Sequence, residues 1–306
     1  MCFPAYEEGR LLEYGRKFGC DLVDFLRESK LDSETSYEEK LIKAEVVIVM
    51  YASSNHFQEA IGNMKRHRQH LQNKIIFYDL GLTTQERLEL ETIENLGLRR
   101  FNYEKYPSFV RNLKAYHFKA LIAAEVYATL PVFWLIDSSV RFNNLQPIYD
   151  MVESSQNSHK QFLFMVNDGT FESFLMNDEI NKHSIFAATN PAMYEYFPIT
   201  AEEAMSREMV QAATGFIRQS NFSREVLKWQ VLCSLTEDCM NPPGSALKCY
   251  FGDDRYRTYS YCHRFDQSSI ALILASLYER KANWKEERAK NHHVFAENVV
   301  VVWETE

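Results

Sequence analysis

Pro131-Val132-Phe133-Trp134-Leu135-Ile136-Asp137-Ser138-Ser139 is the stretch that decides the fold. Its five apolar residues follow one another without polar alternation, which is typical of a strand covered on both faces. Such a strand belongs in the centre of a mostly parallel sheet with helices on both sides. In open α/β sheets, ligands bind beyond the carboxyl ends of the strands, where Asp137 is expected. A carboxylate there can hold a divalent cation, which in turn holds a diphosphate. The alternative is that Asp137 only caps the following turn.

The order of elements along the chain favours the same fold class. Apolar runs predict strands at 46–51, 74–80, 132–137, 162–166 and 209–217. Helices are predicted at 57–72, 113–129, 223–235 and 270–278, and Thr83-Thr84-Gln85-Glu86 carries the capping residues of another. Strands that alternate with helices indicate βαβ units. We therefore expect a single α/β domain with a Rossmann-type, mostly parallel sheet flanked by helices. A helical extension at 1–44 precedes it, and 98–110 is expected to be a loop.

The composition excludes several classes of function. The 306 residues include only 10 glycines, and neither G-x-G-x-x-G nor G-x-x-x-x-G-K-[ST] occurs. The net charge of -8 opposes a nucleic-acid partner, and the basic run at 65–68 is expected to be a solvated helix face. No apolar run approaches the ~18 residues that span a bilayer. The first eight residues also lack the order of a signal peptide. We therefore expect no nucleic-acid partner and no membrane span in this chain.

The cysteines bear on the compartment. Four of the six, Cys233, Cys239, Cys249 and Cys262, lie in one short region, and no C-x-x-C is present. Such a cluster fits disulfides formed in an oxidising compartment, and the alternative is buried thiols in a cytosolic protein. Proximity favours pairing Cys233 with Cys239 and Cys249 with Cys262, although four cysteines allow three connectivities. In a secreted protein, the sequon at Asn221 would accept a glycan.

Four segments taken together resemble a known family. They are Ala52-Ser53-Ser54-Asn55-His56-Phe57, Tyr78-Asp79-Leu80-Gly81-Leu82, Trp134-Leu135-Ile136-Asp137-Ser138-Ser139 and Cys262-His263-Arg264-Phe265-Asp266-Gln267-Ser268. With them, residues 45–280 resemble an uncharacterised animal family of glycosyltransferase-like proteins with the GT-A fold of nucleotide-diphospho-sugar transferases. The resemblance implies a GT-A-like domain at 45–306, with a nucleotide-binding half at 45–142 and an acceptor half at 143–306. It also implies the Golgi lumen or the secretory pathway. Because this chain shows no signal or anchor, a cytoplasmic location stays open.

The resemblance implies roles for residues of the donor site. In GT-A enzymes the turn after the first strand touches the nucleotide, which here implies Tyr51, Ser53, Ser54 and Asn55. A basic residue before the metal motif meets the diphosphate, and Lys119 occupies that place, with Arg100 as a further candidate. The metal motif, normally Asp-x-Asp, is Asp137-Ser138-Ser139 here, so Ser139 stands where the second carboxylate is expected. Asp137 is then the ligand of Mn²⁺ or Mg²⁺, with His263 as an additional ligand.

The resemblance also implies the acceptor side and the reaction. The late Asp266-Gln267 pair falls there, and Asp168 or Asp266 would deprotonate the acceptor hydroxyl if the reaction inverts configuration. For Asp266, the alternative is an N-cap of the helix that follows it. The expected activity is transfer of a hexose from a UDP-sugar to a glycan or glycoprotein. Two alternatives are a non-catalytic member that binds a glycan or a partner, and another Rossmann-like enzyme such as a methyltransferase.

Overall fold

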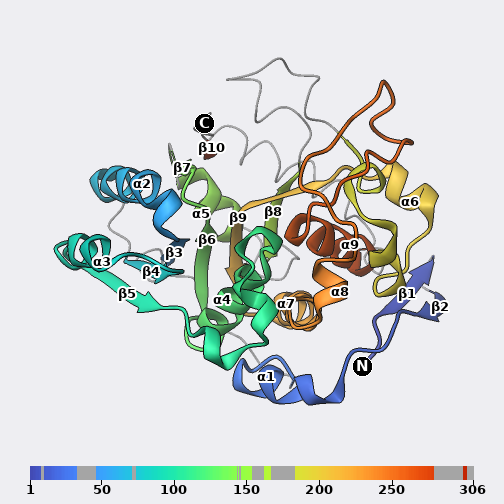
Figure 1. The fold of residues 1–306 in the computed structure, drawn as a ribbon, viewed down its shortest axis with the longest axis horizontal. Helices are drawn as coiled ribbons and strands as arrows, with labels where there is room; N and C mark the ends of the chain where they lie inside the picture. Colours follow the sequence, from blue (N-terminus) through green and yellow to red (C-terminus); the bar gives the residue numbers. More distant parts are fainter. Residues whose placement is uncertain are drawn as a thin grey trace.

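The structure is a computed structural model that describes residues 1–7, 10–32, 46–70, 74–142, 144, 146–153, 162–166, 183–278 and 299–301. Its centre is a six-stranded sheet in the order β5-β4-β3-β6-β9-β8 (Figure 1). The strands are β3 (Val47–Ala52), β4 (Ile75–Asp79), β5 (Leu96–Arg100), β6 (Val132–Ile136), β8 (Phe162–Val166) and β9 (Val210–Arg218). β5, β4, β3 and β6 run parallel to one another, whereas β9 is antiparallel to both β6 and β8. The predicted mostly parallel α/β sheet is therefore confirmed.

The order of the strands creates a reversal point in the middle of the sheet. From β3 the chain moves outward through β4 to β5, and then returns to place β6 on the other side of β3. The connections that leave β3 and β6 therefore diverge, which opens a crevice at the carboxyl ends of these two strands. Ser53 and Asp137, which follow β3 and β6 directly, both stand at this edge, as predicted.

Helices cover both faces of the sheet. The helices are α1 (Val23–Glu28), α2 (Phe57–His70), α3 (Thr84–Glu91), α4 (His117–Tyr127), α5 (Gln146–Glu153), α6 (Ala201–Ser206), α7 (Asn221–Ser234), α8 (Glu237–Met240) and α9 (Asp266–Tyr278). Short 3-10 helices are Cys20–Leu22, Ser54–His56, Tyr103–Lys105, Ser108–Arg111, Leu113–Ala115, Phe186–Ala188 and Pro191–Glu195. Strand β7 (Val140–Phe142) pairs with β10 (Val299–Val301). α3 begins with the predicted capping box of Thr83 and Glu86.

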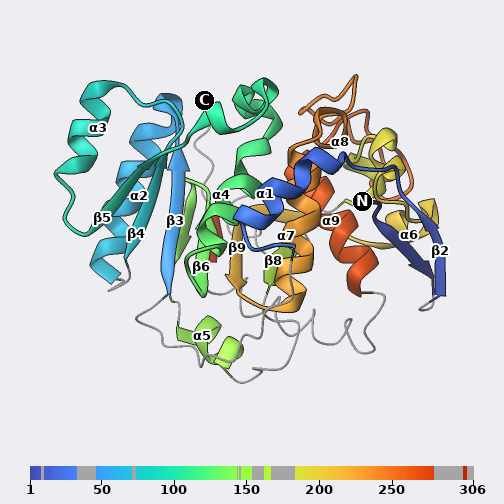
Figure 2. The same ribbon diagram turned by 90° about the horizontal axis from the view of Figure 1, so that it is seen from below.

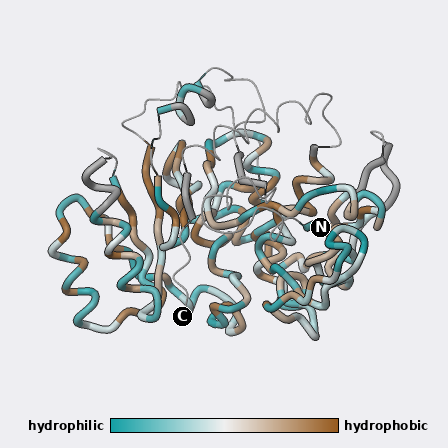
Figure 3. The backbone as a smooth tube through the Cα atoms, turned by 90° about the horizontal axis from the view of Figure 1, so that it is seen from above, coloured by the Kyte–Doolittle hydropathy of each residue, from teal (hydrophilic) through white to brown (hydrophobic). Residues whose placement is uncertain are grey.

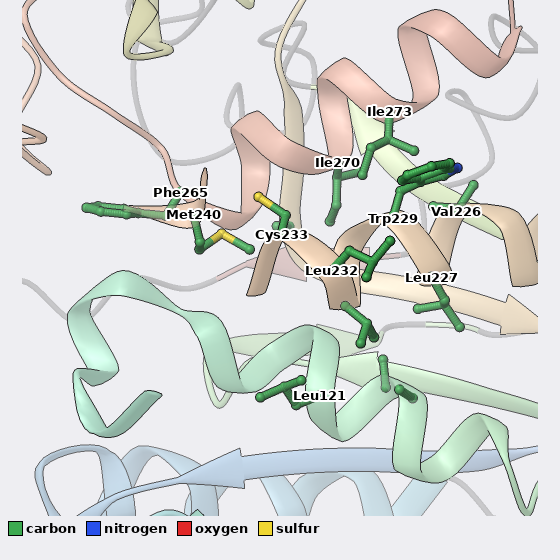
Figure 4. Close-up of a cluster of buried hydrophobic side chains, with 14 of the residues drawn as sticks. Leu121, Val226, Leu227, Trp229, Leu232, Cys233, Met240, Phe265, Ile270 and Ile273 are labelled. Carbon is green, nitrogen blue, oxygen red and sulfur yellow. The ribbon is translucent and has the colours of Figure 1, made fainter. Parts of the chain in front are cut away.

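Alternate residues of β3 enter two separate cores, as expected of a strand buried on both faces. Val47 and Val49 join a core that includes α4, α7 and α9, whereas Ile48 and Met50 join one that includes α2. The first core is the larger, and Figure 4 shows Trp229 and Leu232 of α7 between Leu121 of α4 and the side chains of α9. Figure 3 shows the hydrophobic residues concentrated along the central strands, with hydrophilic stretches on the helices at the periphery.

Two local predictions were wrong. The N-terminal region is not simply helical, because β1 (Pro4–Glu7) and β2 (Arg10–Tyr14) form an antiparallel pair before the short α1. Phe3, directly before β1, packs against Trp229 of α7 in the second half, at 5.0 Å between ring centroids. Figure 2 shows β2 beside α6, at the end of the molecule opposite β5. The segment 98–110 is not all loop, because β5 extends the sheet beyond β4. β5 lies at the sheet edge and is only partly buried, so its apolar run is short.

The disulfides follow the predicted pairing. Cys233 is bonded to Cys239, and Cys249 is bonded to Cys262. Both bridges lie in the second half, where they hold the chain between α7 and α9. Within the described residues, no helix is long and apolar enough to cross a lipid bilayer.

Candidate functional site at the carboxyl ends of β3 and β6

A cavity of about 350 Å³ opens at the crevice beyond β3 and β6. Six of the residues predicted for the donor site line it, namely Tyr51, Ser53, Asn55, Lys119, Asp137 and Ser139. The volume lies within the range of small-molecule sites, which is roughly 300–1,000 Å³. Residues far apart in the sequence therefore converge on one polar cavity at the reversal point of the sheet.

Asp137 forms the floor of the cavity together with two partners from other elements. The hydroxyl of Tyr51, in β3, donates a hydrogen bond to Oδ1 of Asp137. The ammonium of Lys119, in the first turn of α4, lies 2.9 Å from the same oxygen. The Asp137 side chain is 22% exposed, so part of the carboxylate faces the cavity. The backbone N–H of Asp137 donates to the carbonyl of Ala213 in β9 at 2.7 Å, which fixes the end of β6.

Lys119 connects two carboxylates. Its Nζ lies 2.9 Å from Oδ2 of Asp266 and donates a longer hydrogen bond, 3.3 Å, to the carbonyl of Ala212. Burial alone would lower the pKa of this lysine, but Asp137 and Asp266 together outweigh it and raise that pKa well above its usual value. Burial raises the pKa of Asp266, with Asp137 acting in the same direction and Lys119 against it. Lys119 is therefore a charged ammonium held between two acids.

A second polar group in the cavity was missed by the sequence analysis. Glu59, in α2, accepts a hydrogen bond from the hydroxyl of Ser138, and Nδ1 of His56 lies 3.5 Å from its carboxylate. On the same helix, the amide of buried Asn63 donates to the carbonyls of Ser138, at 2.6 Å, and Val140. His56, Glu59 and Asn63 recur at helical spacing after Ser53, and this spacing is the signal that could have identified them.

Two other residues predicted for the donor site, Ser54 and Arg100, are not among those that line this cavity. Ser54 turns toward α3, where its hydroxyl donates to Glu86 at 2.6 Å and to the carbonyl of Gly81 at 3.1 Å. Arg100 is exposed at the end of β5, opposite Asp79 and two strands away from β3, and it does not line the cavity. Asp168 lies outside the described residues. The roles of Ser54 and Arg100 at the nucleotide therefore stay predictions.

The predicted acceptor-side residues are integrated into the core. Gln267 donates to the carbonyl of Val210 at 3.1 Å and so ties α9 to β9. His263 is fully buried, accepts a hydrogen bond from the backbone N–H of Asn190 at Nδ1, and has Nε2 3.1 Å from the carbonyl of Met240. Burial lowers the pKa of His263 to about 4, so the ring is neutral. With both nitrogens engaged, His263 has none for a cation, and its predicted role as a metal ligand is corrected.

The donor atoms do not fit Mn²⁺ or Mg²⁺, which prefer several oxygen ligands around one point. Among the described residues, no group of three or more His, Cys, Asp and Glu side chains could hold a metal ion. The carboxylates of Asp137 and Asp266 already neutralise Lys119, and a serine hydroxyl stands at 139. Asp266, the first residue of α9, is committed to this ion pair rather than to a metal.

Comparison with known proteins gives a consistent but weak likeness. Residues 1–124 match a family described as "Protein of unknown function (DUF1647)". No curated protein matches the chain. The solved structure of the galactosyltransferase LgtC with donor and acceptor sugar analogs is similar at 13% identity and a TM-score of 0.38, over 64% of this chain and 66% of that one.

Two further solved structures are similar to this chain. The mannosyltransferase Ktr4p from S. cerevisiae is 12% identical, with a TM-score of 0.43, over 89% of this chain and 78% of that one. The bifunctional glycosyltransferase WbbM, in its apo form, is 12% identical, with a TM-score of 0.41, over 83% of this chain and 50% of that one. All three TM-scores are below 0.5, so the likeness is too weak to assign a function.

Proposed function

We propose that this chain is a glycosyltransferase that binds a nucleoside diphospho-sugar, by preference a UDP-hexose, in the cavity beyond β3 and β6. The observation that carries the proposal is the convergence of Tyr51, Ser53, Lys119 and Asp137 on one cavity at the reversal point of the sheet. That point is where open α/β sheets bind their ligands. Ser53 and Asp137 belong to the segments that resemble nucleotide-diphospho-sugar transferases, whereas Tyr51 and Lys119 lie outside those segments.

The cavity offers suitable partners for a diphosphate. The helical segment that begins at Ser54 and continues as α2 presents its first N–H groups, which have no partner within the helix, to the edge of the sheet. Such a helix N-terminus favours phosphate groups. Lys114 and Lys119 also line the cavity, and the ammonium of Lys119 is balanced by Asp137 and Asp266. We therefore place the diphosphate between the start of α2 and Lys119.

The transfer step requires that the acceptor hydroxyl be held in line with the leaving diphosphate. Glu59 is the carboxylate that faces the cavity without an ion pair to lysine, and it is our candidate for orienting a hydroxyl of the sugar or the acceptor. For an inverting reaction, Asp168 stays our proposed base, whereas Asp266 is committed to Lys119. If the reaction retains configuration, no strong base is required. The acceptor proposed is a glycan or glycoprotein.

The two disulfides support the lumen of the secretory pathway as the location, because such bonds persist in oxidising compartments. Asn221 of the sequon is exposed at the start of α7. We therefore expect protein from its native cells to carry both bonds. Mass spectrometry that finds all six thiols free and Asn221 without a glycan would contradict this location.

The test is a screen of nucleotide sugars with the intact chain. UDP should raise the melting temperature, because a ligand that binds only the folded state adds about 2.7 kcal/mol of stability at one hundred times its Kd. UDP-hexoses should then be hydrolysed or transferred. AMP serves as a control that lacks the diphosphate. Binding of UDP without turnover of any sugar would favour the non-catalytic alternative. A shift with S-adenosylmethionine and none with any nucleoside diphosphate would refute the proposal.

A further inference from the structure

A single ammonium, that of Lys119, stands between the two carboxylates of Asp137 and Asp266 beside the cavity. Lys119 is nearly buried, its side chain being 9% exposed, and it lies 2.9 Å from an oxygen of Asp137 and 2.9 Å from one of Asp266. Its ammonium is also 5.0 Å from the ring centroid of Tyr116, whose face attracts a cation. This lysine is fixed in one place by groups from α4, β6 and α9, rather than reaching freely into solvent.

A divalent cation at Asp137 would have to share that carboxylate with the lysine. Oδ1 of Asp137 already accepts from the Tyr51 hydroxyl and contacts the ammonium, and Oδ2 lies 3.1 Å from the same ammonium. Two cations on one carboxylate repel each other, and the low dielectric of a buried site strengthens the repulsion. The place where a metal would be held by Asp137 is therefore taken by Lys119.

We infer that Lys119, held between Asp137 and Asp266, supplies the positive charge for the diphosphate, so that nucleoside diphosphate binding needs no divalent metal. The inference rests on the proposed function, because it concerns the same cavity. Lysine clamps stabilise phosphate charge as metal ions do. The side chain of Lys119 lines the cavity beside Asp137, while its longest contact, 3.3 Å to the carbonyl of Ala212, ties it to β9. Asp266 is then a positioning residue that keeps the ammonium in place.

The deciding measurement is isothermal titration of UDP into the intact chain, once with excess EDTA and once with excess MnCl₂. We expect the two Kd values to agree within about threefold, which is well under 1 kcal/mol. Binding that is tighter with manganese by about tenfold or more, 1.4 kcal/mol, would overturn the inference and leave the proposed function intact. Absence of UDP binding under both conditions would overturn the proposed function together with the inference.

Variants of Lys119 test the same point without metal. Lys119→Met should weaken UDP binding in EDTA by about tenfold or more, whereas Lys119→Arg, which keeps the charge, should retain most of the affinity. Lys105→Met is the matched control, since Lys105 pairs with Glu28 at 2.7 Å and does not line the cavity. If Lys119→Met fails to fold, Lys119→Arg and the EDTA comparison still decide. Lys119→Met with wild-type affinity in EDTA would refute the role of the lysine.

Discussion

Asp79 is the last residue of β4 and Asp137 directly follows β6, the two strands that flank β3, yet their carboxylates have different partners. Asp79, at the end of β4, is 2% exposed, and its Oδ1 accepts from the N–H groups of Gly81 and Leu82, both at 2.7 Å. Its Oδ2 pairs with Arg87 at 3.2 Å, so every partner lies within eight residues along the chain. Asp137 is bound by Tyr51, 86 residues away in the sequence, and by Lys119, and it lines the cavity.

The difference lies in where the partners come from. A carboxylate satisfied by its own turn closes that turn and adds stability, but it has no capacity left for a ligand. A carboxylate held by side chains from other elements depends on the whole fold, and it keeps a face toward the cavity. Position at the carboxyl end of a parallel strand therefore does not by itself identify a functional aspartate.

Acid is expected to have the largest effect, and it acts through three buried histidines. Burial lowers the pKa values of His117, His183 and His263 to about 4, whereas an unfolded histidine titrates near 6.5. Between these values the unfolded chain binds the proton and the folded chain does not. The stability that depends on neutral histidines in the folded chain is thus complete above about pH 6.5 and is lost as the pH falls toward 4. Near pH 5, each histidine should lower the free energy of unfolding by about 2 kcal/mol. Asp266 acts in the opposite direction, because burial raises its pKa in the folded chain.

Chemical denaturation at neutral pH and near pH 5 measures this loss. His263→Gln should reduce the slope of stability against pH, whereas His56→Gln should not, because the side chain of His56 is 59% exposed. Equal stability of the wild-type chain at both pH values would show that the buried histidines do not control acid unfolding.

Asp137→Asn should give the next largest effect, and it separates the two aspartates by activity. Donor hydrolysis should fall about a hundredfold, the scale of losing a principal electrostatic stabiliser, because a neutral amide orients the ammonium of Lys119 less firmly toward the cavity. The fold should persist, since Asp266 still pairs with Lys119 and the amide oxygen still accepts from Tyr51. The measurements are turnover and melting temperature. Ser139→Ala, in the same cavity, should reduce turnover much less.

Near wild-type turnover in Asp137→Asn, with little change in stability, would instead support the interpretation of Asp137 as a turn cap. Asparagine caps about as well as aspartate, so a capping role predicts that pattern. The comparison with Asp79 would then fail, because both aspartates would be structural.

The sequence predicted the features that depend on local pattern. The unbroken apolar runs of β3, β4 and β6 identified strands buried on both faces, and Thr83 with Glu86 identified a helix start. The edge strand β5 was missed because half-buried positions and Gly97 weaken its pattern. The N-terminal strand pair was also missed, since its position depends on Phe3 packing against Trp229 in the second half.

The site was predictable where strand ends determine it, and not where tertiary contacts do. Asp137 and Lys119 could be predicted, because one directly follows β6 and the other lies in α4, the helix before it. The helical spacing after Ser53 marks the face of α2 that carries Glu59, but its hydrogen bond with Ser138 depends on α2 packing beside the turn after β6. The same applies to His263, whose buried hydrogen bonds to Asn190 and Met240 come from distant segments.

Asp79→Asn should have the smallest effect, confined to stability. The amide oxygen can still accept from Gly81 and Leu82, so the turn after β4 should close as before. What is lost is the charge paired with Arg87, whose side chain is 34% exposed, and a partly exposed pair contributes about 1 kcal/mol. Turnover and UDP affinity should equal those of the wild type.

Arg87→Met should lower the free energy of unfolding by a similar amount, and the double variant should lower it by less than the sum, because the two changes remove one shared interaction. A loss of turnover in Asp79→Asn at unchanged stability would instead place Asp79 in the site. Hydrogen bonding of a carboxylate within its own turn would then no longer distinguish Asp79 from Asp137.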